Sequence, residues 1–93
     1  MMSDNDLHKD HRDRLRKKLY SDDGDTLEPH ELLEVLLYSV YTQKDTNPIA
    51  RALIKRFGTI YNVFEADQKE LMSVPGVGKQ TAAMLKLQAA LLR

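Results

Sequence analysis

Two glycines separated by one residue, Gly76 and Gly78, stand just before a run that predicts a helix from Lys79 onward. Glycine has no Cβ, so it permits unusual backbone conformations and lets a bound group come close to the peptide N–H groups. The first N–H groups of a helix have no helical partner, and they lie at the positive end of its dipole. Together these features predict an anion site built from backbone, with phosphate as its ligand.

The residues around the two glycines extend this predicted site. Lys79 supplies a positive charge at its rim, and Val77 is expected to turn inward and anchor the turn. Gln80 and Thr81 offer their N–H groups, and Thr81 also a hydroxyl. Such contacts hold phosphate and carry no base information. The predicted DNA-binding residues are Gly76, Val77, Gly78, Lys79, Gln80 and Thr81. The simpler alternative is a structural turn between helices, followed by a solvated lysine.

Residues suited to covalent or metal chemistry are few. The chain has no cysteine and three histidines, of which His8 and His11 lie three apart on a predicted helix. Two histidines without a third ligand do not make a zinc site. No Ser–His–Asp or Cys–His arrangement is evident. We therefore expect no catalytic residue, no metal site and no enzymatic activity in this chain.

Charge is distributed unevenly along a chain whose net charge is zero. Residues 1–46 hold 7 Lys/Arg against 11 Asp/Glu, whereas residues 47–93 hold 7 against 3. A basic second half can present one face to phosphates, although an ordinary mixed surface is the alternative. The polar N-terminus does not resemble a signal peptide, and no apolar run is long enough to span a membrane. We expect a cytoplasmic protein without a membrane partner.

The elements that must position the glycine turn are all predicted to be helical. Apolar spacing indicates a compact bundle of about six helices in a single all-α domain, residues 7–93, behind a flexible tail at 1–6. The apolar stretch 32–40 is expected to form the central core helix, with an edge that could take a partner. Gly58 should end a helix, Thr59 should cap the next one, and Asp67 with Glu70 forms a capping-box pattern. The helices are expected near residues 7–20, 29–40, 46–57, 60–65, 68–73 and 79–92.

The stretch 71–85 resembles the helix-hairpin-helix motif of DNA repair and recombination proteins. The positions that match the motif are Leu71, Val74, Gly76, Val77, Gly78, Ala82 and Leu85. Upstream, residues 53–63 resemble the degenerate first hairpin of a tandem pair, as in UvrC-type nucleases, so that 47–93 forms a tandem unit. This hairpin has one glycine, which implies a weaker grip, with Arg56, Gly58 and Thr59 as secondary DNA contacts. The motif also implies a monovalent cation at the carbonyls of Met72, Val74 and Val77.

Three further stretches, 11–15, 28–34 and 44–50, resemble the N-terminal region of bacterial RadC-family proteins, and the similarity covers residues 8–93. In that family this region precedes a JAB/MPN-type domain with a zinc signature. The signature is not found in these 93 residues, so we expect a truncated or naturally short form. Any metallohydrolase chemistry, and a JAB/MPN-type domain as a partner, would belong to a longer form.

The sequence thus predicts a DNA-binding module of a RadC-like, DNA-repair-associated protein, one that holds the backbone without reading sequence. Contact with two to four phosphates predicts a slope of about −2 to −4 for log K against log salt. Two alternatives stay open. One is a protein-interaction or dimerisation module, favoured by the zero net charge and the apolar stretch 32–40. The other is a domain that positions a hydrolase domain absent from this chain.

Overall fold

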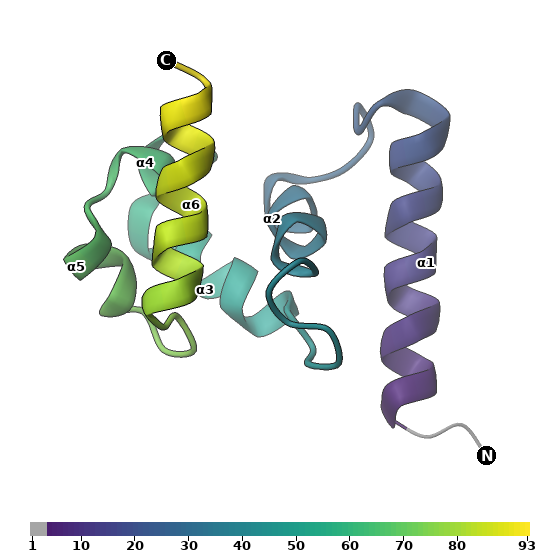
Figure 1. Cartoon of the computed structure of the whole chain (residues 1–93). Coiled ribbons are helices and arrows are strands. Elements are labelled where there is room, and N and C mark those ends of the chain that lie inside the picture. Colours follow the sequence, from purple (N-terminus) through teal and green to yellow (C-terminus); the bar gives the residue numbers. More distant parts are fainter. Residues whose placement is uncertain (1–3) are drawn as a thin grey trace.

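The computed structural model describes residues 4–93, with side chains from Lys9 onward. Six α-helices make up this part of the chain, and it contains no strand, so the predicted all-α class is confirmed. Figure 1 shows α6 beside α4 and α5, with α3 packed against α2 and α4, and with α2 between this group and α1. The helices are α1 Asp4–Asp22, α2 Pro29–Leu37, α3 Asn47–Phe57, α4 Ile60–Glu65, α5 Gln68–Met72 and α6 Lys79–Leu91.

Most helix boundaries follow from the stop and cap signals in the sequence. Gly58 ends α3 with φ +92°, a conformation that favours glycine, and its N–H donates to the Ile54 carbonyl at 2.7 Å. The Thr59 hydroxyl then accepts from the Asn62 N–H at the start of α4. The predicted capping box at α5 forms in both directions, and its Asp67 carboxylate accepts from the Glu70 N–H at 2.7 Å.

The N-terminal helix is longer than expected. It begins at Asp4, ahead of the start expected near residue 7; residues 1–3 lie outside the described part. Acidic residues are favoured in the first turn of a helix, which accounts for the early start. The helix ends at Asp22, whose pKa is lowered chiefly by a hydrogen bond from the Thr26 hydroxyl.

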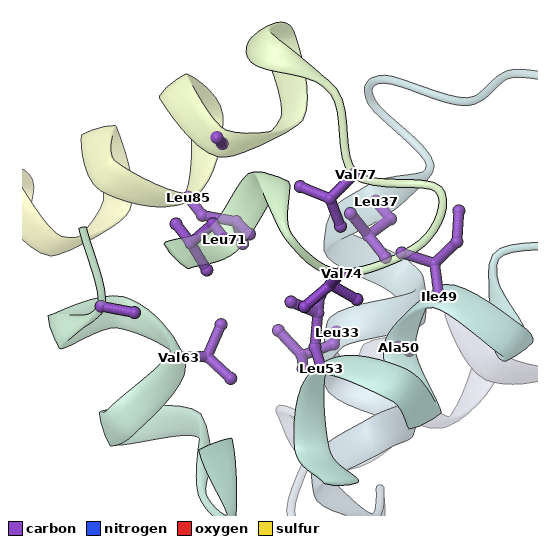
Figure 2. Packing of buried hydrophobic residues seen from close by; sticks show 12 residues of the cluster. Leu33, Leu37, Ile49, Ala50, Leu53, Val63, Leu71, Val74, Val77 and Leu85 are labelled. Atoms are coloured by element: carbon purple, nitrogen blue, oxygen red, sulfur yellow. The ribbon is translucent and has the colours of Figure 1, made fainter. Parts of the chain in front are cut away.

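The core is formed by residues of α2, α3, α4, α5 and α6, and Val74 and Val77 of the glycine turn belong to it. Figure 2 shows Val74 and Val77 packed beside the leucines of the core. Two apolar side chains at helix ends face solvent: Met72, the last residue of α5, is 42% exposed, and Leu92, which follows α6, is 77% exposed. The fully buried leucines are Leu33, Leu37, Leu53, Leu71 and Leu85.

α1 is held to α2 by a small apolar cluster and a buried arginine. Arg12 is only 7% exposed, which is unusual for an arginine. Its guanidinium lies 4.3 Å from the centre of the Tyr38 ring. It also donates to the carbonyls of Tyr41, Thr42 and Lys44 at 2.5–3.0 Å, so the loop after α2 is built around this side chain. Five donors in a planar fork make arginine suited to such a role.

A buried carboxylate joins α1, α2 and the start of α3. Glu34 is fully buried, and its Oε1 lies 2.9 Å from the His11 Nε2. Its Oε2 accepts from the Asn47 side-chain amide at 3.2 Å, and its backbone carbonyl accepts from the Thr46 hydroxyl. A buried charge must be hydrogen-bonded, and these partners satisfy it. Glu34 also helps to raise the pKa of the neighbouring Tyr38 to about 12, after the larger effect of burial.

Candidate nucleic-acid interface

The turn between α5 and α6 is a tight hairpin in which Gly76 is required by the fold. The Val74 N–H donates to the Leu71 carbonyl at 3.1 Å, and the Val77 N–H donates to the Val74 carbonyl at 3.0 Å. Gly76 has φ +89°, which disfavours any residue with a side chain. A Cβ at this position would also lie 2.9 Å from the Ile49 Cγ1, so the turn rests directly on α3.

Gly78 differs from Gly76 in its backbone conformation and in its surroundings. Its φ of −97° and ψ of −174° are extended backbone that any residue adopts, and a Cβ there would meet nothing within 4 Å. The packing therefore does not need glycine at this position. Because Gly78 has no side chain, the solvent side of the first turn of α6 stays open. Here the first helical bond runs from the Ala82 N–H to the Gly78 carbonyl, so the N–H groups of residues 79–81 have no helical acceptor.

The start of α6 has no side-chain cap, in contrast to the starts of α4 and α5. Thr59 and Asp67 accept bonds at the first turns of α4 and α5, and Asp45 accepts from the Asn47 N–H at the start of α3. At α6, Gly78 has no side chain with which to cap the helix. An anion from solvent can therefore take the place that a cap fills elsewhere.

Tyr41 fixes the hairpin from the inner side. Its hydroxyl donates to the Gly76 carbonyl at 2.5 Å and accepts from the Thr81 hydroxyl at 2.7 Å. Thr81 is 1% exposed, so the expectation that its hydroxyl reaches phosphate is wrong, because that hydroxyl points into the protein. Val77 is buried as expected, and its N–H is occupied within the turn. Of the predicted contacts, Gly76, Gly78, Lys79 and Gln80 are the exposed ones.

The first hairpin satisfies its own backbone groups. The Thr59 hydroxyl accepts a hydrogen bond from the Asn62 N–H of α4, and the Asn62 side-chain amide donates to the Phe57 carbonyl at 2.9 Å. The Gly58 N–H is bonded to α3. Arg56, Gly58 and Thr59 are exposed, but the start of α4 is already capped. The start of α4 is therefore less open to an anion than the start of α6.

One cation near the second hairpin was not singled out from the sequence. The Lys44 Nζ lies 5.5 Å from the centre of the Tyr41 ring, and the Tyr41 hydroxyl touches the hairpin. The only signal in the sequence was a lysine in a polar loop, with nothing to indicate where that loop lies. Within residues 9–93 the ion pairs are His11–Glu34 and Arg16–Asp13, so Lys44 and Lys79 have no carboxylate within 4.0 Å.

The predicted cation site consists of backbone carbonyls of the turn. The Val74 carbonyl accepts one bond, from the Val77 N–H, and keeps a second lone pair. Carbonyl oxygens are the donors that bind alkali-metal ions in selective protein sites, so those of Met72, Val74 and Val77 fit such an ion in kind. The anion site at the start of α6 does not require it.

Two further findings concern metal binding and membrane-spanning helices. The described side chains contain no group of three metal-ligating His, Cys, Asp or Glu residues. His11 is engaged with Glu34, and the His8 side chain lies outside the described part. None of the described helices is long and apolar enough to cross a membrane.

Comparisons with known proteins agree with one another. A family model described as UPF0758 N-terminal matches residues 7–83. A UPF0758 protein from Fusobacterium nucleatum is 38% identical to the chain over 86 residues. The match covers 92% of this chain and 37% of the relative, so the chain spans little more than a third of that protein's length. No solved structure matches the chain.

Proposed function

The chain belongs to the UPF0758 family, which is the RadC family, and from this premise we propose that it binds the phosphate backbone of DNA without reading base sequence. The site is the second hairpin, with the exposed backbone of Gly76 and Gly78, the first turn of α6, and Lys79 and Gln80. Val77 and Thr81 belong to the same site as anchors on its inner side. The chain would thus be the DNA-binding module of a DNA-repair-associated protein.

The observation that supports this proposal best is the uncapped start of α6. Its free N–H groups and dipole favour an anion, and the open space at Gly78 lets a phosphate approach them. Lys79 adds a full positive charge at the first helical position. Because all these donors address phosphate, the predicted binding is independent of sequence and falls steeply with salt.

A single substitution can place an anion in this site from within the protein. We expect Gly78→Glu to fold normally, because its backbone is extended and the space is open. The new carboxylate would cap α6 and repel phosphate. Gln68→Glu is the matched control: it makes the same charge change at the first residue of α5, where Asp67 is already the cap.

The assay is fluorescence anisotropy of labelled single-stranded, duplex and branched DNA between about 50 and 200 mM salt. We expect Gly78→Glu to lower the affinity by about tenfold or more, since one close charge repulsion is worth over about 1 kcal/mol. Gln68→Glu should stay close to wild type. Equal affinities of the two variants would contradict the hairpin as the site, and no binding by wild type at low salt would contradict the function.

A second candidate function is favoured by exposed leucines at the end of α6. Leu87, Leu91 and Leu92 are 56–77% exposed, and this face would suit a second copy or another domain of a longer protein. The relative from Fusobacterium continues well beyond the matched region, so a positioning role for this domain is compatible with its length. Concentration-dependent dimers in sedimentation experiments, together with no affinity for DNA, would favour this second function.

A further inference from the structure

We infer that the bound DNA strand continues from the hairpin into a groove between the last turn of α3 and residues 73–75, where Lys55 and Arg56 bind its next phosphates. This inference rests on the proposed function and adds a second subsite to it. The groove has a volume of about 520 Å³. Its lining residues are Ala52, Lys55, Arg56, Ser73, Val74 and Pro75.

The groove is continuous with the hairpin. Residues 73–75 are the three that lead directly into Gly76, so they form one wall of the groove and one arm of the turn. The opposite wall is α3, which touches the same turn one helical turn earlier, where Ile49 lies against Gly76. Ile49, Ala52 and Arg56 are spaced i, i+3 and i+7, so they share one face of α3. A strand leaving the hairpin along this face enters the groove.

The groove is lined by two cations that are not paired with a carboxylate among the described side chains. Lys55 and Arg56 are both exposed, and neither has a carboxylate within 4.0 Å among the described side chains. α3 contains no acidic residue at all. The Ser73 hydroxyl already donates to the Glu70 carbonyl at 2.6 Å, so the two cations are the side-chain donors that remain for a phosphate.

The floor of the groove is apolar, which favours a DNA strand over a free anion. Val74 is buried, Ala52 is half-buried, and Pro75 forms an exposed apolar edge. A DNA strand alternates charged phosphates with less polar sugars, so cations along a rim and an apolar floor match both parts. Basic residues in the last turn of a helix are also favoured by its dipole, and the test must separate that role from binding.

The test compares Lys55→Gln/Arg56→Gln with a control that changes the same charge elsewhere. Lys17→Gln/Lys18→Gln removes two adjacent exposed charges from α1. Both variants lower the net charge equally, so a difference between them cannot come from the overall field. Anisotropy of a labelled DNA duplex is measured from about 50 to 200 mM salt for wild type, for both variants and for Gly78→Glu. Thermal melting confirms that all four are folded.

We expect the Lys55→Gln/Arg56→Gln variant to bind several-fold more weakly than the Lys17→Gln/Lys18→Gln control, with the largest difference at the lowest salt concentration. Its slope of log K against log salt should be smaller in magnitude by about one to two. The Lys17→Gln/Lys18→Gln control should keep the wild-type slope. If the two double variants bind alike while Gly78→Glu loses affinity, the groove is overturned and the hairpin stands. If wild type does not bind duplex DNA at all, both the hairpin and the groove are overturned.

Discussion

Replacing Tyr41 by phenylalanine removes one oxygen that joins two parts of the candidate site. The hydroxyl donates to the Gly76 carbonyl and accepts from the Thr81 hydroxyl, at 2.5 and 2.7 Å. The ring itself can stay in place, because phenylalanine has the same shape without the oxygen. The substitution therefore tests whether these two bonds hold the hairpin in the conformation that we propose binds phosphate.

The expected loss of stability follows from the burial of Thr81. Each hydrogen bond contributes about 0.5–1.5 kcal/mol net, and a buried hydroxyl left without a partner costs about 1–3 kcal/mol. Thr81 is 1% exposed, so water cannot replace the lost partner. We expect Tyr41→Phe to lower the free energy of unfolding by roughly 2 kcal/mol. For a domain of this size, that is a fall of about 10 °C in Tm.

A double-mutant cycle with Thr81→Val isolates the bond between the two hydroxyls. Once Thr81 has no hydroxyl, Tyr41→Phe leaves no buried donor behind, so the double variant should be more stable than the sum of the single effects predicts, by about 1 kcal/mol. Urea denaturation measures all four proteins. Strictly additive effects would refute the hydroxyl contact that links Tyr41 and Thr81.

DNA affinity gives a second readout of the same substitution. Tyr41→Phe removes no cation, so it should weaken DNA binding while leaving the slope of log K against log salt unchanged. A residue that merely adds charge would change the slope. An unchanged affinity with the expected loss of stability would show that Tyr41 supports the fold and has no part in the binding site.

Three further substitutions test the geometry of the turn and the small apolar cluster between α1 and α2. Gly76→Ala should destabilise the protein by about 2 kcal/mol or more, from a positive φ and a Cβ 2.9 Å from Ile49, whereas Gly78→Ala should change stability by less than about 1 kcal/mol in the same urea denaturation. Equal effects of the two would contradict the different roles of the glycines. Tyr38→Phe removes a buried hydroxyl with no partner among the described residues, so stability should stay level or rise by about 1 kcal/mol. Burial raises the pKa of Tyr38 from 10.0 to about 12, so the unfolded chain releases this proton at a lower pH than the folded protein does. Wild type should therefore lose stability from pH 10 towards pH 12, and Tyr38→Phe should not show this loss.

The fold could be predicted well where local signals decide it. The end of α3 at Gly58, the cap at Thr59 and the capping box at Asp67 each depend on a few neighbouring residues, and each lies where the sequence places it. The start of α1 was predicted less well, because acidic residues suit both a polar tail and a first helical turn. The role of Arg12 could not be predicted, because its partners are carbonyls some thirty residues further along the chain.

In the candidate site, too, local features could be predicted and long-range contacts could not. The glycine spacing and the inward turn of Val77 could be read from the sequence, since both belong to the local geometry of the hairpin. The position of Lys44 and the inward direction of the Thr81 hydroxyl could not, because both depend on Tyr41 reaching the hairpin from a distant loop. Contacts over 35 and 40 residues leave no periodic pattern in the sequence.

The stretches that resemble the RadC family outside the hairpin act together on this same loop. Arg12 of α1 gathers the carbonyls of residues 41, 42 and 44, and Glu34 of α2 fixes the start of α3 through Asn47. The loop held between them carries Tyr41, whose hydroxyl holds the Gly76 carbonyl. A continuous set of hydrogen bonds thus runs from α1 through the loop to the hairpin. Arg12 and Glu34 therefore support the loop from which Tyr41 reaches the turn before α6.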